Sequence, residues 1–256
     1  MIGGFALNQE RKDEMMSRIS GLLYKDWSMK ATIGLYTNYY LLTTISIAIC
    51  VNSYYFRSAD PIDKRFASSP MTIEQLLNNF YELPASSLEL LVNEMQEVRF
   101  SKGHILLESD RLERKVYFLT KGLVRAYSPQ PEQDITFWFG LEGDIVLSMR
   151  SYVEQVKSYE DVELMEDSTL YGIGIEKLKS LYLRDIHIAN LGRVIVEGEL
   201  LKMEKRWISS QIKSAKERYD ELVEESPALL QRVPLKYIAS FLRMTPVSLS
   251  RIRKEK

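Results

Sequence analysis

The chain has 256 residues, 45% of them hydrophobic and 27% charged, which is ordinary for a globular protein large enough for two modest domains. Its formal net charge of −1 gives the whole chain no preference for an anionic partner, so any basic surface must come from local clustering. One cysteine and two histidines exclude an internal disulfide and a cysteine-ligated iron–sulfur or zinc site, and we expect no metal and no cofactor. A single thiol also fits a reducing compartment, and we expect a cytoplasmic protein.

Residues 1–70 differ in character from the rest of the chain. Residues 31–56 carry no charge and are numerous enough to span a bilayer, and tyrosines flank their most apolar part, Leu41–Val51. Threonine, serine and asparagine dilute this segment, however. Three interpretations stay open: a single membrane-spanning helix, a soluble packing segment, or a poorly ordered or spurious extension upstream of Met71, where the recognisable domain begins.

The pattern between residues 71 and 175 changes from helix to strand. Residues 71–93 show helical spacing of apolar side chains, with Thr72 as a cap and a break at Pro84. Short runs of β-forming residues follow, separated by glycine turns such as Lys121-Gly122, at 98–100, 105–107, 115–120, 123–127, 135–139, 161–164 and 170–175. Short, evenly spaced strands of this kind predict a closed or rolled antiparallel architecture.

One of these runs, Phe137-Trp138-Phe139, could be taken for a ligand box. Alternation along a strand instead sends Phe137 and Phe139 to one face and Trp138 to the other, and we expect core packing.

After residue 175 the spacing returns to that of helices, expected at 176–184, 186–211, 214–225, 235–242 and 246–254. The second of these is long and carries a heptad repeat of apolar residues, interrupted by Gly198 and Lys205, at Leu191, Val194, Leu201, Ile208 and Ile212. This spacing predicts a coiled-coil seam between two copies of the chain. The alternative is a helix packed only on its own domain.

The last two helices have the features of a helix-turn-helix. Thr245 can cap the final helix, and Pro246 occupies its first position, where a missing N–H costs nothing. Apolar residues are available to pack at Ile238, Ala239, Leu242, Val247, Leu249 and Ile252. Ser248, Arg251 and Lys254 recur every three residues and predict one exposed ridge that could enter the major groove of DNA.

Local charge supports this interpretation. Residues 228–256 contain seven basic residues and one acidic residue, Glu255, in a chain that is nearly neutral overall. Such a patch suits binding of phosphates by counterion release. The alternative is a solvated helical tail, which would not need the cap, the proline and the apolar seam together.

These features together resemble the Crp–Fnr superfamily of bacterial regulators, with YIASFLRMTPVSLSRIRK similar to its recognition region. The resemblance implies an α+β fold: an antiparallel β-roll like a cyclic-nucleotide-binding domain over 71–185, a dimerisation helix over 186–211, and an all-α, winged-helix-like DNA-binding domain over 212–256. The sequence ends soon after the recognition helix, so we expect most of the β-wing to be lacking. The resemblance further implies a homodimer that binds double-stranded DNA and RNA polymerase.

The resemblance also assigns roles to residues near the recognition helix. Arg251 matches the base-reading arginine of the family, whose guanidinium fork can bond guanine O6 and N7. Pro246 and Val247 match base-proximal positions, and Thr245 and Ser248 match phosphate-facing ones. The remaining DNA-binding candidates are Lys254 and Arg243, which stands where the family often has glycine; a left-handed arginine or a shifted turn would both serve.

The roll does not carry the cyclic-nucleotide cassette of its family. Gly143-Asp144 matches the turn before it, but the positions of the ribose-binding Glu and the phosphate-binding Arg and Ser fall on Ser148, Ser158 and Tyr159. Arg150 and Lys157 lie nearby without the family spacing. We therefore expect an unidentified small-molecule effector or no ligand, and no cyclic AMP binding of the usual kind.

No combination of residues in the sequence points to an enzyme. It lacks a recognisable catalytic triad, a phosphate-binding glycine loop and metal-ligand spacing. The alternatives to a DNA-binding regulator are a membrane-tethered signalling protein with a cyclic-nucleotide-type domain, anchored through 31–56, and a ligand-binding module whose helical tail contacts protein.

Overall fold

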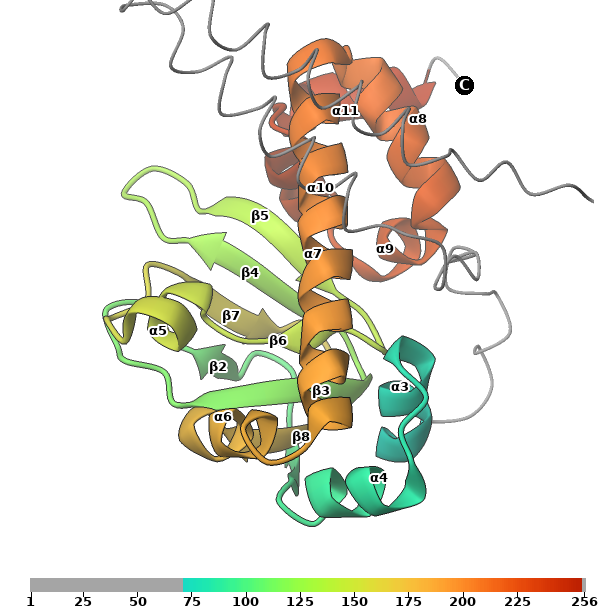
Figure 1. The fold of residues 1–256 in the computed structure, drawn as a ribbon. Helices are drawn as coiled ribbons and strands as arrows, with labels where there is room; N and C mark the ends of the chain where they lie inside the picture. Colours follow the sequence, from blue (N-terminus) through green and yellow to red (C-terminus); the bar gives the residue numbers. More distant parts are fainter. Residues whose placement is uncertain (1–70, 255–256) are drawn as a thin grey trace, which may run out of the picture. The chain divides into compact units, whose positions relative to one another are not determined.

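The computed structural model describes residues 71–254 (Figure 1). Their strands form two antiparallel four-stranded sheets, ordered β1-β8-β3-β6 and β2-β7-β4-β5. The strands are β1 (Gln96–Phe100), β2 (Ile105–Leu107), β3 (Lys115–Lys121), β4 (Val124–Ser128), β5 (Ile135–Gly140), β6 (Ile145–Val146), β7 (Asp161–Leu164) and β8 (Ser168–Gly174). The rolled antiparallel architecture expected from the sequence is confirmed.

The strands differ from their expected positions in two places. Strand β6 was not expected, because two residues are too few to show alternation; it completes the first sheet by pairing with β3. A register shift between Ala126 and Tyr127 also interrupts the pairing of β4 with β5 next to Phe137. The expectation of core packing is confirmed for Phe139, which is buried, and is wrong for Phe137, which is 39% exposed.

Helices flank the roll and follow it in the chain (Figure 1). They are α3 (Ile73–Phe80), α4 (Ala85–Val92), α5 (Met149–Glu154), α6 (Ile175–Tyr182), α7 (Ile186–Ile212), α8 (Ala215–Glu225), α9 (Pro227–Arg232), α10 (Leu235–Phe241) and α11 (Pro246–Lys254). Capping boxes start α3 at Thr72 and α8 at Ser214. Helices α5 and α9 were not expected, since six residues are too few for a helical repeat. Pro227 occupies the first turn of α9, where its missing N–H costs nothing.

Three clusters of buried side chains form the core of the described residues. One lies between the two sheets, and a second packs α3, α4, α6 and the start of α7 against β3 and β8. The third joins α8 to α11 with side chains of the roll, namely Leu123, Phe139 and Met165. The C-terminal helices therefore share a core with the roll.

Within residues 71–254 no helix is long and apolar enough to cross a membrane. The uncharged segment 31–56 lies outside the described residues, as does the rest of 1–70.

Candidate nucleic-acid interface

Helices α10 and α11 form the helix-turn-helix that the sequence predicts. Ile238, Ala239, Leu242 and Leu249 are buried in the third core cluster, and Ile252 is half-buried beside them. Because these side chains hold both helices to the cluster, the opposite side of α11 is exposed.

The turn between the two helices is tight. Arg243 adopts the left-handed backbone conformation, with φ 54°. Of the two alternatives for this turn, the structure therefore has the left-handed arginine and not a shifted turn. Its backbone N–H donates to the Ser240 carbonyl at 3.0 Å. The Thr245 hydroxyl then caps α11 by accepting from the backbone N–H of Ser248 at 3.1 Å, as predicted.

The exposed face of α11 differs by one position from the predicted ridge. Val247 was expected to pack, but it is 72% exposed, whereas Ser248 is half-buried. The cause is the angle of about 100° per residue: with Leu249 and Ile252 inward, positions 247, 250, 251 and 254 point outward. A shallow hollow on this face is lined by Pro246, Val247, Ser250, Arg251 and Lys254. Ser250 was missed, and its spacing of three from Val247 was the signal that could have found it.

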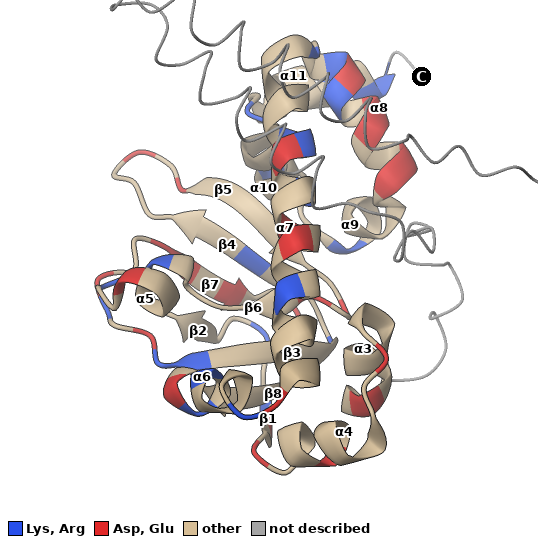
Figure 2. Cartoon of the chain, viewed as in Figure 1, with Lys and Arg blue, Asp and Glu red and all other residues tan. Residues whose placement is uncertain are grey.

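The charges of this region are unevenly distributed. The last turn of α11 carries Arg251, Arg253 and Lys254. Helix α8 instead carries several acidic residues, drawn red in Figure 2. A polyanion is therefore attracted to α11 and repelled by α8, which favours one direction of approach.

An ion-pair cluster joins α9 to two turns of the roll. The Arg232 guanidinium donates to Glu142 at 2.8 Å and to Glu166 at 2.6 Å. Burial acts to raise the pKa of Glu142, but hydrogen bonds from Arg232 and from the Gly122 backbone N–H outweigh it and hold that pKa below its usual value. We call Arg232, Glu142 and Glu166 the α9 cluster.

A second polar contact fixes α10 to the β4–β5 hairpin. The Arg125 side chain is 2% exposed and lies between the rings of Tyr127 and Tyr237, 4.0 and 3.8 Å from their centroids. It forms ion pairs with Asp134 and Glu163. The Ser240 hydroxyl accepts from the Thr136 N–H at 2.9 Å and donates to the Asp134 carbonyl at 3.0 Å.

Sequence reasoning missed the Arg125 contact. Its only signal was a charged residue in the middle of the β-forming run at 123–127, which identifies no partner.

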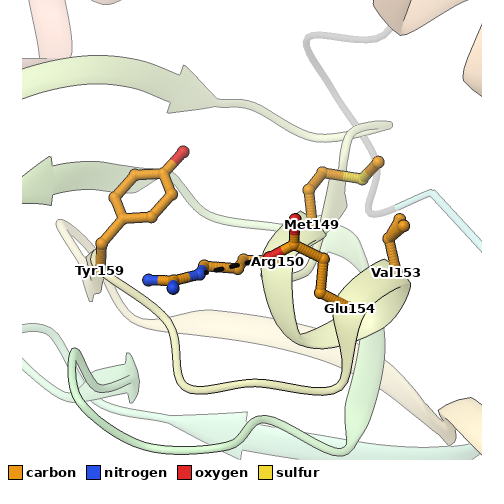
Figure 3. Close-up of a pocket in the computed structure, with 5 residues that line it drawn as sticks. All are labelled: Met149, Arg150, Val153, Glu154 and Tyr159. Carbon is orange, nitrogen blue, oxygen red and sulfur yellow. Dashed lines mark ion pairs between the residues drawn. The ribbon is translucent and has the colours of Figure 1, made fainter.

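The candidate ligand residues of the roll do not form one site. Arg150 and Tyr159 line an open hollow with Met149, Val153 and Glu154 (Figure 3), and Arg150 pairs with Glu154 at 3.4 Å. The hollow is mostly apolar, and the arginine in it is already neutralised by a carboxylate.

The other three candidates have structural roles. Ser148 is buried and caps α5. Ser158 is buried and donates to the Glu108 carbonyl at 2.8 Å. Lys157 is exposed and pairs with Asp110 at 3.3 Å. Neither these residues nor Arg150 and Tyr159 form the convergent set of donors that a phosphate requires.

The long helix α7 packs on its own roll at its beginning and is exposed further along. Ile188 and Leu191 are buried in the core cluster of α3, α4 and α6. From Val196 onwards the helix exposes large apolar side chains. Leu191 was expected in a seam between two copies, but its side chain is buried within its own chain.

Several solved structures of Crp–Fnr regulators share this fold. FixK2 from Bradyrhizobium japonicum has a TM-score of 0.55 and 19% identity, over 63% of this chain and 83% of its own. A CooA variant from Carboxydothermus hydrogenoformans has a TM-score of 0.51 and 23% identity, over 64% and 77%. A structure from Eubacterium rectale, described as a transcriptional regulator of the crp/fnr family, has a TM-score of 0.55 and 16% identity, over 69% and 87%.

No family model and no curated protein matches the sequence. The chain has the Crp–Fnr fold: a β-roll of the cyclic-nucleotide-binding type, a long helix and a C-terminal helix-turn-helix.

Proposed function

We propose that this protein is a dimeric, DNA-binding transcription regulator whose helix α11 lies in the major groove. The observation that carries the proposal is the exposed face of α11, where Arg251 and Lys254 stand beside Val247 on a helix held from behind by buried Leu249. An arginine fork can read guanine, and an exposed valine can contact a thymine methyl. Thr245, Ser248 and Arg243 at the start of the helix would contact phosphates.

The same fold and the long α7 support a homodimer that acts in the cytoplasm and contacts RNA polymerase. Two copies of α11 related by a twofold axis would read half-sites roughly 34 Å apart. A membrane-tethered signalling protein remains the alternative function, since it would use the same roll with 31–56 as its anchor.

Selection of binding sites from random DNA with the full chain tests the proposal. We expect enrichment of a twofold-symmetric sequence with half-sites about one helical turn apart. Enrichment of no sequence by folded protein, together with its recovery in the membrane fraction of cells, would favour the alternative.

The hollow of the roll is not suited to a cyclic nucleotide. Its single arginine is paired with Glu154, and the buried hydroxyls of Ser148 and Ser158 are used by the backbone. We therefore expect that millimolar cyclic AMP will leave both the melting temperature and the DNA affinity unchanged. A clear upward shift of the melting temperature would contradict this, because a ligand that binds only the folded state must stabilise it.

A further inference from the structure

The roll holds a charged group that is removed from water at its contact with α10. The Arg125 side chain is 2% exposed. Its Nε donates to the Thr136 hydroxyl at 3.0 Å, and its two Nη atoms donate to Asp134 at 2.9 Å and to Glu163 at 3.3 Å. All three acceptors belong to the roll, so the roll fixes the plane of this guanidinium and leaves its two faces for other groups.

The two faces of the guanidinium connect the roll to α10. The ring of Tyr127, in β4, has its centroid 4.0 Å from the Arg125 Cζ, and the ring of Tyr237, in α10, has its centroid at 3.8 Å. A guanidinium is attracted to an aromatic face, and more strongly where water is excluded. A lysine has no planar fork, so it could not bond three acceptors and stack on two rings together. The site therefore requires arginine.

Two further residues of α10 contact the same part of the roll. Ser240 exchanges two hydrogen bonds with the backbone of the β4–β5 hairpin, at 2.9 and 3.0 Å. The ring of Phe241 meets the ring of Phe139, in β5, edge to face with centroids 5.3 Å apart. Together with Tyr237, these residues occupy positions i, i+3 and i+4, which form one face of a helix. A helix held at three points of one face cannot rotate about its axis, so the roll fixes the orientation of α10.

Helix α11 follows the orientation of α10. Ile238 and Ala239 of α10 and Leu249 of α11 are completely buried in one cluster. The backbone N–H of Met244, in the turn, donates to the Ala239 carbonyl at 3.0 Å. Because packed side chains and this bond join the two helices, a displacement of α10 on the roll displaces α11 as well.

We propose that Arg125 is a positioning residue for DNA binding: it holds α10 on the roll and thereby sets the direction in which α11 is presented. In the dimer of the proposed function, two such units keep two recognition helices at one separation, as a twofold-symmetric site requires. This inference rests on the proposed function and specifies how its binding site is held.

The consequence of losing the contact depends on the DNA. A whole site binds both recognition helices, so variable orientations must be brought into register at a cost in affinity. A single half-site requires one recognition helix and does not depend on the separation between two. The ratio of the affinities for whole site and half-site therefore reports positioning, whereas a smaller fraction of folded protein lowers both affinities alike.

The full chain would be titrated, by fluorescence anisotropy, into a duplex with the selected twofold-symmetric site and into one with half of that site scrambled. We expect Arg125→Met, which removes the fork but fills similar space, to weaken whole-site binding roughly tenfold or more and half-site binding less than about twofold. Arg99→Met is the control, because it removes the same charge from β1, where the side chain is 78% exposed. It should leave the ratio unchanged.

Tyr237→Leu removes the same contact from the α10 side and is expected to lower the ratio in the same way. Because both substitutions break one contact, the double variant should lose little more than either single variant. Fully additive losses would contradict the inference. Circular dichroism would identify a variant that fails to fold, and if Arg125→Met does so, the ratio measured with Tyr237→Leu decides.

Amide hydrogen exchange at Thr136 tests the contact without DNA. This N–H donates to Ser240 in α10 at 2.9 Å, so its exchange is slowed while α10 lies on the roll. We expect Arg125→Met to accelerate the exchange roughly tenfold or more. Unchanged exchange, or an unchanged ratio of whole-site to half-site affinity, would overturn the inference and leave the regulator function standing. A wild type that protects this N–H but binds no duplex would remove the regulator function and leave the docking of α10 intact.

Discussion

Arg251 and Arg253 carry the same charge on the same helix but point in different directions. Arg251 lines the outer hollow of α11 with Val247 and Lys254, whereas Arg253 is exposed off this face. If α11 lies in the major groove, only Arg251 reaches a base edge. Substituting each of the two residues in turn therefore distinguishes recognition of bases from general attraction to phosphates.

Arg251→Ala is expected to cost roughly 1–3 kcal/mol of binding to the selected DNA site and to blur the preference at one base position. Arg253→Ala is the control: it removes the same charge and should weaken binding to all sequences alike. Fluorescence anisotropy with matched and mismatched duplexes would measure both. Equal loss of sequence preference in the two variants would show that the face of α11 is assigned wrongly.

Local chemistry made some residues predictable and others not. The Thr245 cap and the first-turn position of Pro246 depend on residues within one helical turn, so the sequence was sufficient. The exposure of Val247 depends on the direction from which the rest of the buried cluster approaches α11, and helical spacing alone does not give that direction. The spacing of apolar residues could therefore predict the helix, but it could not predict which of its faces is exposed.

At the scale of elements, two contacts decide where the helix-turn-helix sits on the roll. The α9 cluster joins Arg232 to carboxylates 90 and 66 residues earlier in the chain. Arg125, buried between Tyr127 and Tyr237, fixes α10 to the β4–β5 hairpin. Contacts at such separations leave no periodic pattern in the sequence. Helices α5 and α9 were missed for a related reason: with six residues each, they are shorter than two helical turns and show no repeat.

The α9 cluster makes the free energy of unfolding depend on pH in the acidic range. Because the pKa of Glu142 in the folded protein lies below its usual value near 4.5, its contribution to stability is complete above that value. The contribution is lost as pH falls and the carboxyl becomes protonated in both states. We expect the unfolding free energy of wild type to fall from about pH 5 towards about pH 3 more steeply than that of Glu142→Gln, which cannot titrate at this position.

Urea unfolding at a series of pH values would measure this difference. Glu224→Gln is a suitable control, since Glu224 is exposed on α8. Parallel pH profiles of wild type and Glu142→Gln would show that the ion pair with Arg232 contributes nothing to folding.

For the molecule as a whole, the order of the helices and strands could be predicted from the sequence, but the contacts between these elements could not. The change of period from two to 3.6 near residue 175 marks the end of the roll in the sequence and in the structure, where β8 gives way to α6. The heptad repeat identified α7 but assigned Leu191 to a seam between copies, although that side chain is buried in its own domain. A repeat identifies a helix face, and only the neighbouring elements show whether that face is already covered.

Whether the folded protein presents a cationic helix to duplex DNA can be measured with the full, folded dimer. The measurement is its binding to random-sequence duplex across a salt series. We expect binding at low ionic strength that weakens steeply as salt rises, with a slope that reports several neutralised phosphates. Absence of binding to any duplex at low ionic strength would contradict it.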